Sequence, residues 1–283
     1  MASISQLLND TTERLSKLYS EREASSIMRT LFKDILAYSG TELALYKMRD
    51  LIPEDEKKLK AAIKRLLKGE PIQYIIGHTE FLGFRFKVNE HVLIPRPETE
   101  ELVQWIHQDN KLNNKAILDL CTGSGCIAIS LERLSLQAHV SAVDISPEAL
   151  HVAKENAEHL GASIKFIQTD ILSDEADAKL GSYDIIVSNP PYVLEQEKEF
   201  MHINVLNHEP SLALFVPDHE PLLFYRIISK LAMEHLKPLG KLYFEINEKY
   251  GHEVKLLLEV IGFKNIIIKQ DMHGKDRFVK AEK

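Results

Sequence analysis

The stretch from Pro97 to the C-terminus alternates short apolar segments with amphipathic segments of helical spacing. Apolar strands that alternate with helices are typical of a mainly parallel sheet covered by helices on both faces. The first of these helices is expected at residues 98–107. The sequence therefore predicts an α/β domain. Its strands are expected at residues 116–120, 139–144, 163–169, 183–188, 241–246, 265–270 and 277–281.

The first seventy residues have a different pattern. Apolar residues recur at helical spacing from Ser3 to about Gly69, which predicts a small helical bundle. Gly40 and Gly69 have the character of helix stops, while Thr41 and Pro53 have that of helix starts.

A segment rich in aromatic and β-branched residues follows, from Ile72 to Pro95, with glycines at 77 and 83 and a turn at Asn89-Glu90. This pattern predicts a β-hairpin, in which Phe81 and Phe84 are favoured as core residues over a substrate wall. We therefore expect a helical bundle at residues 1–70, a β-hairpin linker at 71–97 and a catalytic domain at 98–283.

The charge of the chain argues against a protein that grips long stretches of nucleic acid. The formal net charge of its 283 residues is −7, whereas such proteins usually present a strongly basic face. Basic residues do crowd one predicted helix, between Lys57 and Lys68. A solvated helix face is favoured there over a partner site.

Targeting signals and metal-ligand patterns are not found in the sequence. The N-terminus lacks the apolar run of a secretory signal, and no stretch approaches the ~18 apolar residues of a membrane-spanning helix. We expect a cytoplasmic protein with no membrane partner and no metal. The two cysteines, Cys121 and Cys126, are spaced neither as a redox pair nor as a zinc site, so a structural role is favoured for both.

The strongest ligand signal is the segment ILDLCTGSGCIAI at residues 117–129, an apolar strand that breaks into glycines and resumes as a helix. Glycine lets the backbone turn sharply and approach a ligand at the helix N-terminus. The next strand ends in Asp144, whose carboxylate can accept hydrogen bonds from both ribose hydroxyls of a nucleotide-like ligand.

Spacing alone does not choose the cofactor, because Gly123-x-Gly125-x-x-Ala128 also satisfies the dinucleotide pattern. Asp119, at the end of the strand, favours a different ligand. Its carboxylate could orient the loop and reach a cationic amino-acid group, but it would repel a pyrophosphate. An NAD-dependent oxidoreductase remains the competing hypothesis.

The segment Asn189-Pro190-Pro191-Tyr192 ends another buried strand, so it should lie beside the glycine loop. The prolines make a rigid turn that leaves the Pro190 carbonyl free to accept a hydrogen bond. Together with the Asn189 side-chain oxygen it could hold both protons of an NH2 group and aim the nitrogen at an electrophilic methyl group. Tyr192 could stack on the planar group.

These motifs resemble those of the peptide chain release factor glutamine methyltransferases, and the resemblance covers nearly the whole chain. It rests on IPRPETE at residues 94–100, the glycine loop, Asn189 to Tyr192, and Glu209-Pro210-x-x-Ala213-Leu214. The resemblance implies a seven-stranded Rossmann-like S-adenosylmethionine-dependent methyltransferase fold with the last strand antiparallel. It implies N5-methylation of the glutamine in the Gly-Gly-Gln motif of class 1 release factors, with S-adenosylhomocysteine as the product.

The resemblance, taken with the motifs above, gives an expected set of site residues. We expect Asn189, Pro190 and Tyr192 to serve the transfer step, and Pro191 and Glu209 to join these three in binding substrate. The cofactor-binding set is expected to be Asp119, Cys121, Thr122, Gly123, Ser124, Gly125, Asp144, Ile145, Asp170, Ile171 and Asn189.

Three positions depart from the family pattern. His208 and Ile171 stand where aromatic residues are expected, and Asn247 stands where glycine is common. The substitution at Ile171 puts stacking on adenine in question. Glu209 and Arg277 could equally be structural ion-pair members.

Two further functions stay open at this point. An Asn-Pro-Pro-Tyr site can also hold the exocyclic amine of a flipped adenine, as in nucleic-acid methyltransferases, although the acidic composition makes a nucleic-acid partner a weaker hypothesis. The domain could also be a catalytically silent binding module. We expect a monomer, with the N-terminal bundle recognising the protein substrate.

Overall fold

The computed structural model describes residues 3–46, 49–135 and 137–283. The chain forms two compact units. Unit 1 comprises Met1–His78 together with His202–His208, and unit 2 comprises Thr79–Met201 together with Glu209–Lys283. In the described residues, no helix is both long enough and apolar enough to cross a membrane.

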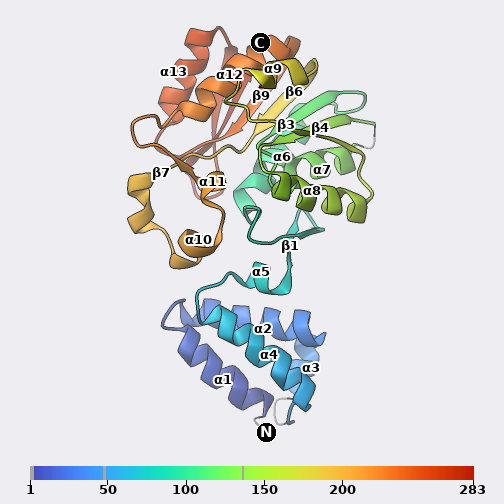
Figure 1. Cartoon of the computed structure of the whole chain (residues 1–283), viewed down its shortest axis with the longest axis vertical. Coiled ribbons are helices and arrows are strands. Elements are labelled where there is room, and N and C mark those ends of the chain that lie inside the picture. The colour runs from blue at the N-terminus through green and yellow to red at the C-terminus, as the bar shows by residue number, and fades with distance from the viewer. Residues whose placement is uncertain (1–2, 47–48, 136) are drawn as a thin grey trace. The chain divides into compact units, whose positions relative to one another are not determined.

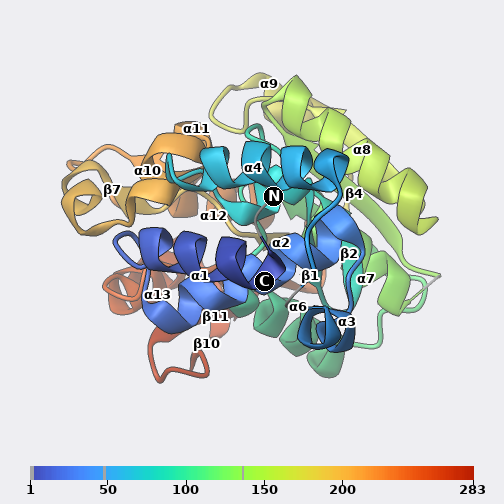
Figure 2. The ribbon, with the colours of Figure 1, turned by 90° about the horizontal axis from the view of Figure 1, so that it is seen from below.

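Unit 1 is a bundle of helices. Its helices are α1 (Ile4–Leu15), α2 (Glu21–Leu36), α3 (Gly40–Leu45), α4 (Pro53–Leu66), α5 (Ile72–Ile76) and α10 (Ile203–His208). Helix α2 packs against both α1 and α4, and Figures 1 and 2 show the three lying side by side. The core between them contains Met28, Leu31 and Phe32, which are fully buried. The predicted bundle is confirmed.

Two details of the N-terminal prediction are wrong. Gly40 does not stop a helix, because α2 already ends at Leu36 with Ala37 in the left-handed conformation (φ 56°). Gly40 instead begins α3, which is capped by the side chain of Ser39. Residues Ile72–Ile76 form the helix α5, not the start of a hairpin.

The basic helix is α4, and its charge is partly neutralised within the helix. Lys58 pairs with Glu54 at 2.9 Å and Lys60 with Glu56 at 2.7 Å, each one turn apart. Pairs of this kind belong to an exposed helix face, which agrees with the solvated face favoured from the sequence.

The segment 202–208 belongs to unit 1 although its chain neighbours belong to unit 2. The ring of His202 stacks on Tyr19 with centroids 5.3 Å apart. Its Nε2 lies 3.0 Å from the Leu18 carbonyl oxygen, and His208 Nε2 lies 3.4 Å from the Lys68 carbonyl oxygen. A late segment of the sequence thus completes the N-terminal unit.

The hairpin is formed by β1 (His78–Phe81) and β2 (Phe84–Lys87). Its turn is Leu82-Gly83, where both residues have positive φ (50° and 77°), as a two-residue hairpin turn requires. The Asn89-Glu90 turn lies beyond the hairpin. Phe81 packs edge-to-face on Phe86 and is buried, which confirms its role in the core.

Unit 2 is built on a seven-stranded sheet with the order β10-β11-β9-β6-β3-β4-β5. All neighbouring strands are parallel except those that pair with β11, the last strand, which runs antiparallel to both β9 and β10. The predicted sheet is confirmed. The strand bounds agree to within one residue, except that the fifth strand begins at Leu236 instead of 241. The strands are β3 (Ala116–Leu120), β4 (His139–Asp144), β5 (Ile164–Gln168), β6 (Tyr183–Ser188), β9 (Leu236–Glu245), β10 (Lys264–Gln270) and β11 (Asp276–Glu282).

Helices cover both faces of this sheet (Figure 1). The longer ones are α6 (Pro97–Asp109), α7 (Cys126–Leu134), α8 (Pro147–Leu160), α12 (Leu223–His235) and α13 (Gly251–Ile261). Shorter elements are α9 (Glu175–Lys179), β7 (Val193–Leu194), η1 (Glu195–Phe200), α11 (Ser211–Leu214) and β8 (Phe215–Val216).

Each face has its own core, because side chains alternate along a strand. In β3, Ile117 packs with α6, α7 and α8, whereas Leu118 and Leu120 pack with α12 and α13. Helices therefore cover both faces of the sheet, and the carboxyl ends of its parallel strands are the edge at which ligands can bind.

Candidate active site

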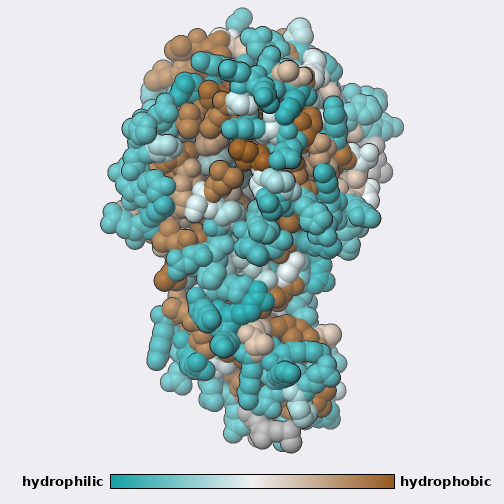
Figure 3. Space-filling view, in the orientation of Figure 1, coloured by the Kyte–Doolittle hydropathy of each residue, from teal (hydrophilic) through white to brown (hydrophobic). Residues whose placement is uncertain are grey.

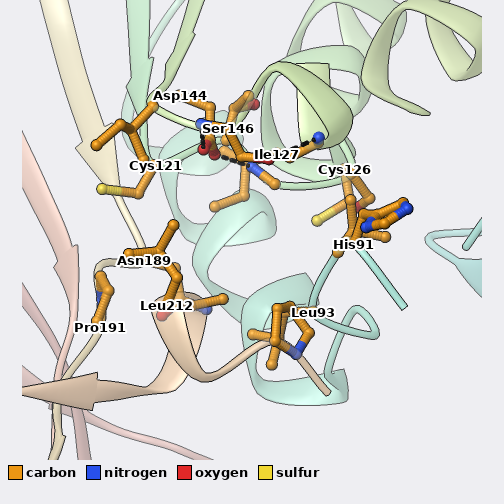
Figure 4. A pocket seen from close by; sticks show the side chains of 18 of the residues that line it. His91, Leu93, Cys121, Cys126, Ile127, Asp144, Ser146, Asn189, Pro191 and Leu212 are labelled. Carbon is orange, nitrogen blue, oxygen red and sulfur yellow. Dashed lines mark hydrogen bonds between the residues drawn. The ribbon is translucent and has the colours of Figure 1, made fainter. Parts of the chain in front are cut away.

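A cavity of about 410 Å³ lies at the carboxyl ends of β3, β4 and β6. Figure 4 shows its walls: Cys121 and Asp144 from the ends of β3 and β4, Asn189 and Pro191 after β6, and Leu93 and Leu212 from other loops. Further lining comes from the segment 90–96, from Thr99 on α6 and from the start of α11.

Most of the expected site residues meet at this cavity. Those that line it are Cys121, Thr122, Gly123, Ser124, Asp144, Ile145, Asp170, Ile171, Asn189 and Pro191. Five expected residues are not among the lining residues: Asp119, Gly125, Pro190, Tyr192 and Glu209.

The cavity has an apolar edge at the protein surface. Leu212 lines it and is 59% exposed. In Figure 3, hydrophobic side chains gather in the middle of the visible face of unit 2, with hydrophilic ones around them.

The two glycines of the loop are needed for different reasons. Gly123 has φ +54°, and a Cβ added to it would meet no atom within 4 Å, so its open side is free for a ligand. Gly125 has φ +81°, and a Cβ there would come within 2.9 Å of Ile129 Cδ1 and 3.2 Å of Ala153 Cβ. Gly125 thus permits the close packing of α7 on α8.

The carboxylate of Asp144 joins the glycine loop to the end of β4. Its oxygens accept hydrogen bonds from the backbone N–H groups of Gly123 at 2.8 Å and Ser146 at 3.0 Å. Burial raises its pKa although these hydrogen bonds act against the shift. Each oxygen retains a lone pair, so two ribose hydroxyls can still donate to it.

Asp119 is fully buried beneath the loop. One oxygen, Oδ2, accepts hydrogen bonds from the Thr122 hydroxyl at 2.6 Å and the Ala128 backbone N–H at 3.2 Å. Its other oxygen, Oδ1, is buried and has no hydrogen-bond partner among the residues that the structure describes. Burial, with a smaller contribution from Asp144, raises the pKa of Asp119 to about 7. An unpartnered buried carboxylate oxygen is costly, and a cationic ligand group would relieve that cost.

Both thiols are apolar in character. Burial raises the pKa of Cys126 to about 12 and that of Cys121 well above its usual value. Thiols that stay protonated are poor nucleophiles. Both side chains line the cavity, where they serve as small wall residues.

The ends of β3 and β6 are tied together, which sets the glycine loop beside Asn189. The Ser188 hydroxyl donates to the Leu120 carbonyl oxygen at 2.7 Å. The fully buried Asn156 of α8 stabilises the glycine loop through hydrogen bonds. Its Nδ2 donates to the carbonyl oxygens of Ser124 at 2.9 Å and Lys87 at 3.1 Å, and its Oδ1 accepts from the Lys87 N–H at 2.7 Å.

A buried hydrogen-bond chain leads away from Asn189. Its Nδ2 donates to the Thr99 hydroxyl oxygen at 3.2 Å, and Thr99 donates to Glu245 Oε2 at 2.7 Å. The Tyr192 hydroxyl donates to the other Glu245 oxygen at 3.1 Å. Thr99 lies within the motif at residues 94–100, but no role could be predicted from the sequence for it, for Glu245 or for Asn156, since each acts through a partner far away along the chain.

Glu209 and Arg277 both form ion pairs. Glu209 accepts from the Arg96 guanidinium and from the Ile94 N–H at 3.1 Å, and so holds the segment before α6 beside the cavity. Arg277 pairs with Asp271 at 3.2 Å and with Glu248 at 3.3 Å.

The three departures from the family pattern have defined positions. Ile171 is 6% exposed and lines the cavity as an aliphatic wall. Asn247 donates to the Tyr192 carbonyl oxygen at 3.3 Å and to Glu197 at 3.1 Å, and so holds the chain after the two prolines. His208 lies in α10 of unit 1.

Two protein families match parts of this chain. A methyltransferase small domain matches residues 97–211, and a PrmC N-terminal domain matches residues 6–77.

Relatives match along almost the whole length. The release factor glutamine methyltransferase of Bacteroides thetaiotaomicron is 46% identical over 96% of this chain and 97% of the relative. That of Flavobacterium psychrophilum is 44% identical over 95% of both chains. Among solved structures, the hMettl16 catalytic domain in complex with MAT2A 3′UTR hairpin 6 superposes with a TM-score of 0.54 over 81% of each chain. At 15% identity, that similarity shows the fold alone.

Proposed function

This chain belongs to the release factor glutamine methyltransferase family, and we propose that it methylates N5 of the glutamine in the Gly-Gly-Gln motif of class 1 release factors at the cavity described above. The cofactor of the family is S-adenosylmethionine, so the NAD-dependent alternative is discarded. A catalytically silent module is discarded because the relatives that match nearly the whole chain are named as methyltransferases. The observation that carries the proposed site is that Asn189 and the glycine loop line one cavity.

The residues of the cavity fit S-adenosylmethionine. Asp119 does not line the cavity, but its carboxyl group lies buried beneath the glycine loop with Oδ1 unpartnered among the described residues, and its charge would favour the cationic amino-acid end of the cofactor. The open side of Gly123 leaves room for backbone contact, and Asp144 offers acceptors for the ribose hydroxyls. Ile171 with Asp170 would flank the adenine. When bound, this cofactor supplies an electrophilic methyl group.

Asn189 and Pro190 would position the nucleophile. The side-chain oxygen of Asn189 and the carbonyl oxygen of Pro190 would accept the two hydrogens of the glutamine NH2 group. An amide nitrogen is a weak nucleophile because its lone pair is delocalised, and hydrogen bonds accepted from its protons return electron density to nitrogen. Alignment of that nitrogen with the methyl group supplies much of the remaining acceleration.

No base needs to act before the transfer. The nitrogen becomes acidic as its new bond to carbon forms, so its proton can leave afterwards to water. Pro191 would form a wall of the glutamine pocket, with Tyr192 close behind it.

The proposal is tested by incubating the protein with methyl-labelled S-adenosylmethionine and either a class 1 release factor or nucleic acid. We expect label in the release factor, on the glutamine of Gly-Gly-Gln when the protein is digested and analysed by mass spectrometry. Label found only in nucleic acid would overturn the assignment in favour of an exocyclic amine target.

We further propose that unit 1 recognises the release factor outside the Gly-Gly-Gln motif, and that the protein acts as a cytoplasmic monomer without a nucleic-acid partner. Unit 1 carries no chemical motif of its own. The net charge of −7 supports a protein substrate over a long stretch of nucleic acid.

A further inference from the structure

The hydrogen-bond chain behind Asn189 contains two buried residues to which the proposed mechanism gives no role, Glu245 and Thr99, of which Thr99 also lines the cavity. Glu245, at the end of β9, is 1% exposed, and the side chain of Thr99, in the first turn of α6, is 2% exposed. Thr99 stands between Asn189 and Glu245. Its hydroxyl oxygen lies 3.2 Å from Asn189 Nδ2 and 2.7 Å from Glu245 Oε2.

The number of hydrogens available between Asn189 and Glu245 determines which group donates in each of the two hydrogen bonds. A threonine hydroxyl has one hydrogen, and a carboxylate oxygen can only accept. Because Thr99 donates its hydrogen to Glu245 Oε2, its oxygen can only accept from Asn189. The NH2 group of Asn189 must then face Thr99.

The direction holds when Glu245 is ionised, because both of its oxygens then only accept. Burial raises its pKa, whereas the hydrogen bonds from Thr99 and Tyr192 and the charge of Arg277 act the other way. A proton bound to Oε1 would lie on the side of Tyr192, which leaves Oε2 free to accept from Thr99. Thr99 is therefore the donor to ionised Glu245 and to Glu245 protonated on Oε1, whereas a proton on Oε2 would reverse the direction. The two donors found in the structure, Thr99 to Oε2 and Tyr192 to Oε1, are those that an ionised Glu245 accepts.

The consequence concerns the opposite end of the Asn189 amide. With NH2 turned to Thr99, the side-chain oxygen is the atom left for the cavity, which Asn189 lines. An acceptor there suits the NH2 group of glutamine and repels the carboxylate of glutamate. A flipped Asn189 carboxamide would present its NH2 hydrogens to the cavity instead, and the site would then prefer the carboxylate of glutamate over the carboxamide of glutamine.

We propose that Thr99 and Glu245 are positioning residues that orient the Asn189 carboxamide and thereby select a carboxamide substrate over a carboxylate. This inference rests on the proposed function, since it concerns how the same site reads its substrate. Neither residue needs to contact the reacting atoms.

The test uses the full-length protein, a peptide containing Gly-Gly-Gln as substrate and the matching Gly-Gly-Glu peptide as competitive inhibitor. Thr99→Val keeps the shape of the side chain and removes the hydroxyl. We expect kcat to fall by about tenfold, the worth of one buried hydrogen bond, while the Kd of S-adenosylmethionine is unchanged.

The sharper readout is discrimination, measured as the Ki of the Gly-Gly-Glu peptide divided by the KM of the Gly-Gly-Gln peptide. In Thr99→Val, the released Asn189 amide can turn its NH2 group to the carboxylate, so this ratio falls by about tenfold. A loss of packing alone would weaken both peptides together and leave the ratio unchanged.

Three further variants complete the design. Thr99→Ser retains the hydroxyl and should recover both kcat and the ratio. Glu245→Gln can put an NH2 group where Thr99 needs an acceptor, and should lower both values. Thr11→Val in α1 makes the same substitution at an equally buried helical threonine of unit 1, and should leave peptide methylation as in the unmodified protein.

The outcomes separate this inference from the proposed function. If the unmodified protein fails to methylate the peptide and the release factor, the proposed function is wrong. If it methylates them, but Thr99→Val and Glu245→Gln keep the original kcat and ratio, the orienting role is wrong and the function stands. Should Thr99→Val lose its thermal transition, Thr99→Ala provides the same comparison with a smaller side chain.

Discussion

Single atoms carry most of the chemistry proposed here, and each depends on a neighbour that holds it. The Asn189 oxygen depends on Thr99 for its direction, and the Asp144 carboxylate is held by two backbone N–H groups. Asp119 is held by Thr122 and the Ala128 N–H on one oxygen, while its other oxygen has no hydrogen-bond partner among the described residues. Substitutions at these positions should therefore change rate and affinity more than stability.

The first prediction concerns Asn189. Asn189→Ala removes one of the two acceptors for the substrate NH2 group, so kcat should fall by about a hundredfold or more. The side chain is only partly buried and makes one hydrogen bond, to Thr99. The melting temperature and the circular dichroism spectrum should therefore match those of the unmodified protein. An unchanged methylation rate would remove the proposed role of Asn189.

A second prediction concerns the pH dependence of cofactor binding. A bound cation favours the ionised form of Asp119, whose pKa is raised to about 7 without ligand. Below that pH the carboxyl group must lose a proton on binding, so the Kd of S-adenosylmethionine should decrease as the pH rises towards 7, by up to about tenfold per unit.

The measurement is calorimetric titration between about pH 5.5 and 7, below the range in which an α-amino group titrates. Two buffers of different ionisation enthalpy would reveal the released proton. Asp119→Asn should bind more weakly and lose the slope. A slope that survives in this variant would show that another group titrates.

At the scale of elements, the site is made by the loop between β3 and α7 and by the turn after β6. These strands are neighbours in the sheet, with Leu120 opposite Ser188. Their two loops thus meet without any long excursion of the chain. The two glycines of the loop also serve different functions. Gly123 leaves access for the ligand, and Gly125 permits the close packing of helices.

A pair of alanine substitutions should distinguish these functions. Gly123→Ala places a methyl group in open space at a positive φ, which costs about 1–2 kcal/mol, and should mainly weaken S-adenosylmethionine binding. Gly125→Ala meets Ile129 and Ala153 as well, which adds about 1–3 kcal/mol, and should lower the denaturation midpoint further. Urea unfolding with and without cofactor measures both effects. Equal midpoints for the two variants would contradict this division.

The sequence predicts the elements better than it predicts the contacts between them. All seven strands of the main sheet and the helix after Pro97 follow from apolar periodicity, because burial on both faces leaves a clear pattern. The predicted hairpin is wrong at Ile72–Ile76, because a short apolar run suits a strand and a helical turn equally. Thr99 and Glu245 are 146 residues apart, and no local pattern pairs a threonine with a glutamate at that distance.

At the scale of the whole molecule, the proposed role of unit 1 is recognition of the protein substrate. If unit 1 binds the release factor, deleting residues 1–78 should raise the KM for an intact release factor much more than the KM for a Gly-Gly-Gln peptide. The kcat for the peptide should change little. Equal changes in both KM values would argue against a recognition role.

This deletion needs a control, because segment 202–208 would lose the partners that it has in unit 1. A companion variant that replaces 202–208 by a short glycine-serine linker, with residues 1–78 retained, separates the two effects. It should bind the peptide normally if the segment serves only to complete the bundle.

The discontinuous make-up of unit 1 also bears on how the protein is synthesised. Domains generally begin to fold as they leave the ribosome, N-terminal parts first. Here the helical bundle is complete only when His202, which stacks on Tyr19, has been synthesised. By then β3, β4, β5 and β6 have already been translated. The three remaining strands of the main sheet emerge only after that stacking partner has arrived. Neither unit can therefore be finished before translation of the other has begun, and a ribosome that stalls between residues 79 and 201 would hold a bundle with the face around Tyr19 still bare.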